Sequence, residues 1–255
     1  MRAAVLGLGE AGRRYAGDLA AAGVAVTGYD VRTMEPPSGV RLAASIPEAV
    51  EGADLVLSLT TAAGSLDAAQ AASGHVATSA VFADLNAASP ARKVAVAREL
   101  ATGLFADVAV LAPVTRQGLR TPVLAAGPGA TAFANLLRPL RAQVEIVPGE
   151  PGAAASRKLL RSVFMKSLAT TILESLAAAR AAGCEQWVRA QIAGELGERG
   201  EALVDRLVDG THQHAGRRRH EMEDTRVYLE ELGTPTDMTS AAIRWLGSIH
   251  AGRRS

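Results

Sequence analysis

The sequence predicts an α/β protein in which a doubly wound, mostly parallel sheet is followed by an all-α C-terminal domain. Three observations predict this class. Short apolar runs alternate with helical segments through residues 2–147, as in parallel sheets that helices cover on both faces. A turn of the form Gly-x-Gly-x-x-Gly follows the first apolar run. After the Pro- and Gly-rich segment 148–152 the strand patterns stop, and only helical patterns follow.

Composition and charge exclude several classes of function. The 255 residues are 48% apolar and 21% charged, and 27 Lys and Arg against 26 Asp and Glu give a net charge of +1. We expect no nucleic-acid partner, because a general polyanion binder has a basic excess. The single cysteine, Cys184, rules out an intrachain disulfide and favours a reducing, cytoplasmic compartment. We expect no membrane partner, because no run of about 18 apolar residues occurs. We also expect no signal peptide, because the five residues between Met1 and Gly7 have the pattern of a strand.

The N-terminal segment has the pattern of a dinucleotide-binding unit. An apolar run over residues 2–6 leads into the glycine turn 7–12, and a helical stretch then reaches about residue 22. A β-branched run over 23–30 follows and ends in Asp30. This order of strand, glycine turn, helix, strand and acid is the Rossmann-type fingerprint, which is far more specific than the glycine pattern alone.

Each glycine of the turn has its own physical reason. Gly7 permits the tight turn, Gly9 lets the backbone approach a pyrophosphate, and Gly12 lets the helix pack closely on the strand. The N-terminus of the helix offers unpaired N–H groups and a positive dipole end to the phosphates. The residues that we expect to bind the cofactor are Gly7, Leu8, Gly9, Glu10, Ala11, Gly12, Asp30, Val31, Arg32, Thr60, Thr61 and Asn86.

Asp30 stands where the ribose of the adenosine would lie. A carboxylate there accepts the ribose hydroxyls and repels a 2′-phosphate, which favours NAD. Arg32 and Thr33 follow within reach, however, and an arginine can hold a 2′-phosphate, so NADP stays open.

The alternation of strands and helices continues to residue 147. We expect further strands at 53–60, 80–84, 104–110, 122–126 and 144–147. The helices beside them are expected at 46–51, 65–72, 90–101 and 130–140. Ligands of such sheets bind at the carboxyl ends of the strands. Thr60 and Thr61, Asn86, and the segment Leu111, Ala112 and Pro113 follow three of these ends, so we expect them to line a nicotinamide and substrate site.

Segment 148–152 marks the domain boundary. We expect a dinucleotide-binding domain over residues 1–150 and a helical substrate and dimerisation domain over residues 151–255. The second domain should begin with one long helix at 153–182, ended by Gly183. Further helices are expected at 185–206, 221–232 and 239–249.

Lysine is rare in this chain, with 3 Lys against 24 Arg, so each lysine is a candidate for a position where a guanidinium cannot serve. They are Lys93, Lys158 and Lys166. Lys158, Ser162 and Lys166 are spaced by four residues and share one face of the long helix. If that face is buried, a lysine could exchange a proton with a substrate oxygen. The alternative is a basic outer stripe.

A second polar cluster lies further along the chain, between His212 and Glu221. Its His-x-His pair has no third ligand at a convincing spacing, so we expect no metal. Arg217 and Arg218, with Glu221 beside them, are candidates for an anion clamp, because arginine binds carboxylate or phosphate bidentately. The alternative is a solvated helix start.

The N-terminal half resembles the β-hydroxyacid dehydrogenase superfamily, which includes 6-phosphogluconate and 3-hydroxyisobutyrate dehydrogenases. The glycine turn opens the chain as it does in that family, and the segment 152–158 fits the family's Gly-x-(Gly/Ala)-x-x-x-Lys pattern. The C-terminal half resembles a little-characterised 6-phosphogluconate dehydrogenase-like subgroup in three segments, 107–113, 158–166 and 214–222. The resemblance implies that Lys158 is the proton donor and acceptor.

Two departures from the family pattern concern the substrate. Ser162 stands where known members have asparagine, and Leu111, Ala112 and Pro113 replace a Ser-Gly-Gly loop. We therefore expect an NAD(P)-dependent oxidoreductase acting on a small, acidic hydroxy or keto compound that the sequence does not name. Ser162 would orient the lysine or the substrate oxygen, and Lys166 would tune Lys158 or bind an anion. The alternatives are an imine reductase and a non-catalytic dinucleotide-binding partner protein.

The long helix also predicts a homodimer. Its apolar side chains outnumber what the few remaining helices of one subunit are expected to cover, and symmetric association normally buries such a surface. They are Leu159, Leu160, Val163, Phe164, Leu168, Ile172, Leu173 and Leu176. The smaller members of the resembled family pair through this domain.

Overall fold

The computed structural model describes residues 1–100 and 104–252, and the chain divides into two compact units. The first unit spans Met1–Lys158 and the second Leu159–Ser255. Each unit is described by itself.

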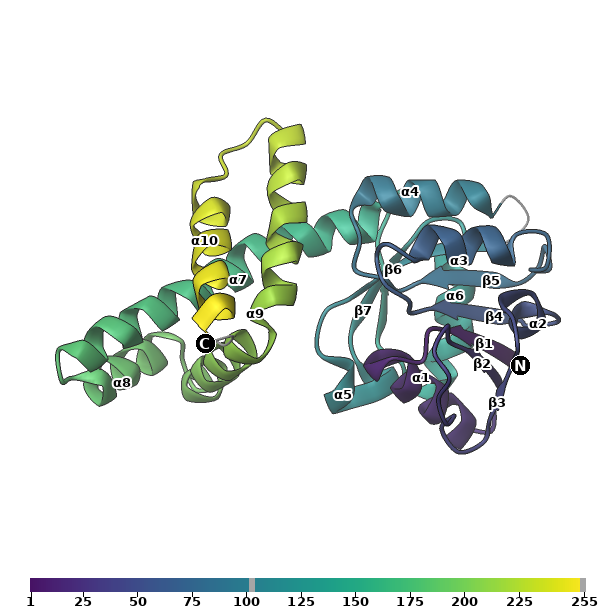
Figure 1. Cartoon of the computed structure of the whole chain (residues 1–255), viewed down its shortest axis with the longest axis horizontal. Helices are drawn as coiled ribbons and strands as arrows, with labels where there is room; N and C mark the ends of the chain where they lie inside the picture. The colour runs from purple at the N-terminus through teal and green to yellow at the C-terminus, as the bar shows by residue number, and fades with distance from the viewer. Residues whose placement is uncertain (101–103, 253–255) are drawn as a thin grey trace. The chain divides into compact units, whose positions relative to one another are not determined.

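The first unit contains an eight-stranded sheet in the order β3-β2-β1-β4-β5-β6-β7-β8 (Figure 1). Neighbouring strands are parallel except for β7, which runs antiparallel to β6. The strands are β1 (Arg2–Leu6), β2 (Ala25–Tyr29), β3 (Val40–Leu42), β4 (Leu55–Ser58), β5 (Val81–Asp84), β6 (Leu104–Val110), β7 (Val123–Ala126) and β8 (Val144–Ile146). This is the predicted doubly wound, mostly parallel sheet. The short strand β3 was not predicted.

Helices cover both faces of the sheet. One apolar core joins the strands to α1 (Glu10–Ala21) and α6 (Ala130–Leu137), through side chains such as Leu19 and Phe133. The core on the other face joins them to α2 (Ile46–Val50), α3 (Ser65–Ala72) and α4 (Pro90–Glu99). The predicted end of α4, Ala101, lies outside the described residues. Strands buried on both faces explain why their sequences are continuous apolar runs.

The strand order reverses beside β1, because β2 pairs with one edge of β1 and β4 with the other. The carboxyl ends of β1, β2 and β4 therefore meet at one edge of the sheet, where the helices turn to opposite faces. In open α/β sheets, such a switch point is where ligands bind.

The second unit is helical. α7 (Ala153–Ala181) begins in the first unit and continues into the second, followed by α8 (Glu185–Glu195), α9 (Gly200–Glu231) and α10 (Asp237–Gly252) (Figure 1). One core packs α7 against α8 and α9, with Ile172 and Leu207 among its buried side chains. A smaller core joins α9 to α10 through Met222 and Leu246. The all-α character predicted for the C-terminal domain is confirmed. No helix among the described residues is both long and apolar enough to span a membrane.

Two predicted helix boundaries were wrong. The helix expected over 185–206 ends at Glu195, because Gly197 adopts a left-handed conformation with φ of +78°. The segment expected to separate that helix from the next is itself helical, since α9 runs through it with one non-helical residue, His214. The arginines at 217 and 218 therefore lie inside a helix and not at its start.

Candidate functional site

The glycine turn connects β1 to α1 at the switch point. Gly7 has φ of +91°, and a Cβ there would lie 2.5 Å from the main-chain oxygen of Leu59. A Cβ on Gly12 would lie 1.8 Å from the main-chain oxygen of Gly7, so both positions require glycine for the fold itself. Gly9 differs, because a Cβ there would meet no atom closer than 4.0 Å. Space therefore remains in front of Gly9.

Gly9 is also the N-cap residue of α1 and has no side chain to cap the helix. The first N–H groups of α1, at Glu10 and Ala11, therefore receive no side-chain cap from Gly9. Unpaired N–H groups and the helix dipole form a binding site for phosphate. The turn thus fits the pyrophosphate of a dinucleotide.

Asp30 follows β2 and ties the glycine turn to the next loop. Its Oδ2 accepts a hydrogen bond from the main-chain N–H of Leu8 at 2.7 Å, and its Oδ1 accepts from the N–H of Arg32 at 2.9 Å. The Arg32 guanidinium pairs with the same carboxylate at 3.2 Å. Burial opposes ionisation of Asp30, but the hydrogen bonds from Arg32 and Leu8 outweigh it, so the pKa of Asp30 lies below its usual value.

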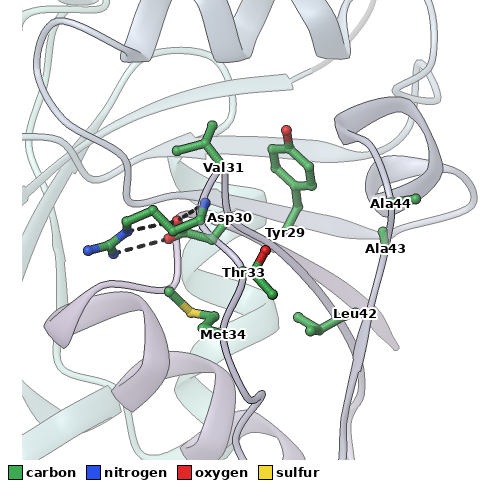
Figure 2. Close-up of a pocket in the computed structure, with 9 residues that line it drawn as sticks. Tyr29, Asp30, Val31, Thr33, Met34, Leu42, Ala43 and Ala44 are labelled. Carbon is green, nitrogen blue, oxygen red and sulfur yellow. Dashed lines mark hydrogen bonds and ion pairs between the residues drawn. The ribbon is translucent and has the colours of Figure 1, made fainter.

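A pocket of about 260 Å³ opens beside this pair (Figure 2). Figure 2 shows Asp30 at the centre of the dashed interactions, with Thr33 and Met34 on the loop that follows it. Val31 and Arg32 are exposed. The residues that line the pocket are Tyr29, Asp30, Val31, Arg32, Thr33, Met34, Leu42, Ala43 and Ala44.

Thr60 and Asn86, which follow β4 and β5, lie side by side. The Thr60 hydroxyl donates to the main-chain oxygen of Thr61 at 3.2 Å and lies 3.5 Å from Asn86 Oδ1. The Asn86 amide donates to Ser58 Oγ at 3.0 Å and to Asp84 Oδ1 at 2.6 Å. The structure therefore brings these two predicted residues together, and Ser58 and Asp84 fix the Asn86 amide.

The segment Leu111, Ala112 and Pro113 leads from β6 into the short helix α5 (Val114–Gln117). Ala112 and Pro113 are exposed, and the chain after them is held by α1, since Asp18 Oδ2 accepts from the N–H of Leu119 at 3.0 Å. Nothing in this segment offers a side-chain hydrogen-bond donor to a carboxylate.

Lys158 is half-buried and belongs to the first unit, close to the start of α7. That start is capped from the sheet. Asp107 Oδ2 accepts hydrogen bonds from the N–H groups of Gly152 at 3.0 Å, Ala154 at 3.0 Å and Ala155 at 3.1 Å. A carboxylate at this end also complements the helix dipole.

Sequence reasoning did not find the partners of Lys93. The Lys93 ammonium lies in the core, 3.2 Å from Asp84 Oδ2 and 3.6 Å from Asp107 Oδ1. Two features of the sequence pointed to this cluster. Lysine is rare in the chain, and the buried strands β5 and β6 each contain the tripeptide Phe-Ala-Asp, at 82–84 and 105–107.

In the second unit, the structure brings together Ser162, Lys166 and Glu221. Lys166 Nζ donates to Ser162 Oγ at 2.9 Å and pairs with Glu221 Oε2 at 2.8 Å. Ser162 is buried, and the Lys166 and Glu221 side chains are 13% and 24% exposed. Lys166 is therefore an ion-paired side chain and not part of a basic outer stripe.

Arg217 and Arg218 point to different surroundings. Arg217 is exposed and lies 3.9 Å from Glu221 Oε1. Arg218 is half-buried and donates to the buried Thr211 hydroxyl. Burial lowers the pKa of Arg218, and the nearby charges of Arg217 and Arg206 add to that effect against the opposing attraction of Glu221. These two arginines therefore have different partners and do not form the expected anion clamp together.

In the described part of either unit, no cluster of side chains is arranged as a metal site. Across residues 1–100 and 104–252, no group of three or more His, Cys, Asp or Glu side chains is placed to hold a metal ion.

Two family models match the chain. Residues 2–115 match the NAD binding domain of 6-phosphogluconate dehydrogenase, and residues 179–249 match a domain of unknown function, DUF1932. With the fold described above, these matches assign the class: an NAD-binding protein of the hydroxyacid dehydrogenase type. The chain belongs to the 6-phosphogluconate dehydrogenase-like proteins of the β-hydroxyacid dehydrogenase superfamily, as the sequence predicted.

Two solved structures resemble the whole chain. A conserved hypothetical protein from Sinorhizobium meliloti 1021 is 30% identical, with 98% of this chain and 89% of that chain covered and a TM-score of 0.79. A conserved protein of unknown function, described as structurally similar to 3-hydroxyacid dehydrogenases, is 27% identical, with 99% and 98% covered and a TM-score of 0.79.

More distant enzymes share the fold alone. The 3-hydroxyisobutyrate dehydrogenase of Mycobacterium tuberculosis is 19% identical, with 98% of this chain and 94% of that chain covered and a TM-score of 0.80. An imine reductase from Pseudomonas sp. is 18% identical over the same shares, with a TM-score of 0.65.

Proposed function

We propose that this protein is an NAD(P)-dependent oxidoreductase that transfers a hydride between the nicotinamide and a small, acidic hydroxy or keto compound. The observation that best supports the proposal is the glycine turn. Gly9 has open space in front of it, while Gly7 and Gly12 are required by the fold. The family model of an NAD binding domain covers this turn.

Different residues of the first unit would bind different parts of the cofactor. The N–H groups at Gly9, Glu10 and Ala11 would hold the pyrophosphate, with Leu8 and Gly12 shaping the turn. The loop of Asp30, Val31 and Arg32 would hold the adenosine, and Thr60, Thr61 and Asn86 the nicotinamide end. A bound nicotinamide supplies or accepts the hydride.

A single substitution tests the cofactor site. Gly9→Val should abolish NADH binding in calorimetry, because the side chain would fill the space of the pyrophosphate. Circular dichroism should show an unchanged fold, since a Cβ at Gly9 would meet no atom closer than 4.0 Å. Retained NADH binding by the folded variant would contradict this assignment.

We propose NAD over NADP as the preferred cofactor. Asp30 already neutralises the Arg32 guanidinium, so the loop offers no unpaired cation to a 2′-phosphate, and the carboxylate repels it. About tenfold tighter binding of NADH than of NADPH is expected, or about 1.4 kcal/mol. Asp30→Ala should remove or reverse that preference. Tighter binding of NADPH by the unmodified protein would show that Arg32 dominates.

We assign proton transfer to Lys158. Its ammonium form donates a proton to a carbonyl oxygen on reduction, and its neutral form takes the hydroxyl proton on oxidation. An arginine cannot perform the second step near neutral pH, because it does not release its proton.

The test of Lys158 separates chemistry from binding. Lys158→Arg should bind NADH as tightly as the unmodified protein and lose about a hundredfold or more in kcat. Turnover within about threefold of the unmodified value would exclude this role for Lys158. Lys166→Arg is the matched control on the same helix, and a comparable loss there would move the proton transfer to Lys166.

The second unit would supply the substrate contacts. Arg218 is the stronger candidate for an anion, because its guanidinium is half-buried and donates to the neutral Thr211 hydroxyl, so an anion beside it would be little screened by water. Ser162, Lys166, Arg217 and Glu221 are further candidates for substrate contacts in the second unit. In the first unit, Leu111, Ala112 and Pro113 are candidates that would contact a substrate without holding a carboxylate. Arg218→Ala should raise KM for an acidic substrate by about tenfold or more, and an unchanged KM would exclude the anion role.

A second candidate is reduction of an imine. It is favoured by the segment 111–113, which has no side-chain donor for a carboxylate, and the imine reductase of Pseudomonas sp. shares the fold. Nicotinamide absorbance should be followed with a panel of keto acids, hydroxy acids and imines. Turnover of imines alone would select the second candidate. NADH binding without turnover of any compound would select a non-catalytic dinucleotide-binding protein.

We also propose that residues 151–255 form the substrate domain and pair two copies of the chain. On α7, Leu159, Ile172 and Leu176 are buried, but Leu160 and Phe164 are 45% and 65% exposed. Light scattering at micromolar concentration should give twice the chain mass of 26.3 kDa. Phe164→Glu should yield monomers. A monomer mass for the unmodified chain would refute the dimer.

A further inference from the structure

The first unit buries three charged side chains that the proposed chemistry does not use. Lys93 on α4 is 1% exposed, and the side chains of Asp84 and Asp107 are fully buried. Asp84 ends β5, and Asp107 lies directly opposite it on β6. Two carboxylates side by side in the core repel one another, so a cation between them is required.

The Lys93 ammonium meets three oxygen atoms. It donates to the main-chain oxygen of Asp84 at 2.6 Å and lies 3.2 Å from Asp84 Oδ2 and 3.6 Å from Asp107 Oδ1. An ammonium has three N–H donors on a compact head, whereas a guanidinium is a planar fork. This geometry explains a lysine in a chain whose other cations are nearly all arginine.

One carboxylate of the cluster, Asp84, binds Asn86, which we assigned to the nicotinamide end of the proposed cofactor site. Asp84 Oδ1 accepts hydrogen bonds from the Asn86 main-chain N–H at 3.0 Å and from the Asn86 amide at 2.6 Å. Asn86 is buried, so these bonds fix both its backbone and its side chain. The orientation of Asn86 therefore depends on Asp84.

The other carboxylate holds the start of α7. Asp107 Oδ2 receives three N–H groups of the first turn, from Gly152, Ala154 and Ala155. Lys158 is one helical turn beyond Ala154. A Cβ on Gly152 would lie 3.0 Å from the main-chain oxygen of Pro90, so the first residue of α4 also packs against this turn.

We infer that Lys93, Asp84 and Asp107 couple Asn86, at the proposed cofactor site, to α7, the helix that bears Lys158. Lys93 is a positioning residue that acts on Asn86 through Asp84 and on the first turn of α7 through Asp107. All the residues concerned belong to the first unit. The consequence for catalysis rests on the proposed function, but the coupling of Asn86 to α7 does not.

Amide hydrogen exchange of the full chain without ligand tests the coupling. Lys93→Met keeps the volume and removes the charge, so both carboxylates lose their shared cation. Exchange should become faster by about tenfold or more in two separate segments, 84–86 and 152–155. Val96→Ala is the matched control, because Val96 is fully buried on the same helix and belongs to the apolar core beside the cluster.

A second measurement uses NADH as the probe. Coupling is reciprocal, so NADH bound at Asn86 should slow the exchange of segment 152–155 in the unmodified protein. Lys93→Met should abolish that effect and weaken NADH binding by about tenfold or more, whereas Val96→Ala should stay within about twofold. If the unmodified protein binds neither NADH nor NADPH, the proposed function fails, and the ligand-free exchange still decides the coupling.

Two results would overturn the inference. One is exchange in Lys93→Met that is no faster in segments 84–86 and 152–155 than in Val96→Ala. The other is a result with a triple variant, which is used if Lys93→Met does not fold. The triple variant of Lys93→Met with Asp84→Asn and Asp107→Asn has no unpaired buried charge, and it should still exchange about tenfold faster in both segments than the unmodified protein. Unmodified rates in that variant would overturn the inference.

Discussion

Lys93 in the first unit and Lys166 in the second unit both pair with carboxylates, but their surroundings differ. Lys93 and its two aspartates are at most 1% exposed. Lys166 and Glu221 are 13% and 24% exposed, and Glu221 has a second cation, Arg217, at 3.9 Å. Two of the three lysines in one chain thus occupy two electrostatic environments.

The difference shows how burial determines what an ion pair can do. Inside the core, the attraction is strong and the partners cannot be replaced by water, so the cluster around Lys93 fixes the geometry of Asn86 and α7. Closer to the surface, water and Arg217 can replace Lys166 as partners of Glu221. The Lys166 cluster can therefore exchange partners.

The largest expected effect is on stability at Lys93. Lys93→Met should lower the free energy of unfolding by about 3–5 kcal/mol, because it leaves two buried carboxylates without a cation. Urea unfolding followed by far-ultraviolet circular dichroism measures it. A loss below about 1 kcal/mol would place Lys93 with ordinary surface pairs and remove the contrast with Lys166.

The sequence predicted the first unit well because its patterns are local. Strand β6 was expected at 104–110 and helix α3 at 65–72, and both occur with those bounds. The second unit was predicted less well. The segment 207–220 contains few large apolar residues, so no helical period was recognised. The structure buries Thr211 and Ala215 there, and small or polar side chains such as these give a weak hydrophobic pattern.

The candidate site divides in the same way. The glycine turn was recognisable because six consecutive residues define it, and its geometry agrees with the reasons given for Gly7 and Gly12. The cluster of Lys93 depends on the register of β5 against β6, which sequence spacing does not specify. The pairing of Lys166 with Glu221 depends on the packing of α9 against α7. The assigned roles of the site residues stay predictions.

A second prediction sharpens the contrast through charge-conserving changes. Lys93→Arg should destabilise the protein by about 1–3 kcal/mol although the charge is kept, because the larger planar group must enter a packed core. Lys166→Arg should cost less than about 1 kcal/mol, because Lys166 and Glu221 are partly exposed and the pair can rearrange. The same urea titrations compare the two. Equal costs would show that the charge and not the shape of the ammonium matters at Lys93.

The third prediction concerns Lys166 alone. Lys166→Met should lower the free energy of unfolding by about 1 kcal/mol, since the partly exposed Glu221 keeps water and Arg217 as partners. Both tryptophans, Trp187 and Trp245, belong to the second unit, so their fluorescence follows its unfolding. Arg180→Met is the control, because Arg180 is 73% exposed in its pair with Glu185, and we expect almost no effect. A loss above about 3 kcal/mol would show that the cluster of Lys166 behaves as a fully buried one.

The smallest expected effect is the dependence of the two clusters on salt. Raising the ionic strength from about 0.01 M to about 1 M shortens the screening length from about 30 Å to about 3 Å, and this screening acts on charges that solvent reaches. The cost of Lys166→Met should therefore shrink by a few tenths of a kcal/mol. The cost of Lys93→Met should stay the same, because no solvent reaches Lys93 or its aspartates. Each variant must be compared with the unmodified protein at the same salt concentration, because salt also changes the stability of the whole chain. If both costs shrink equally, water enters the cluster of Lys93, and burial does not explain the difference between the two lysines.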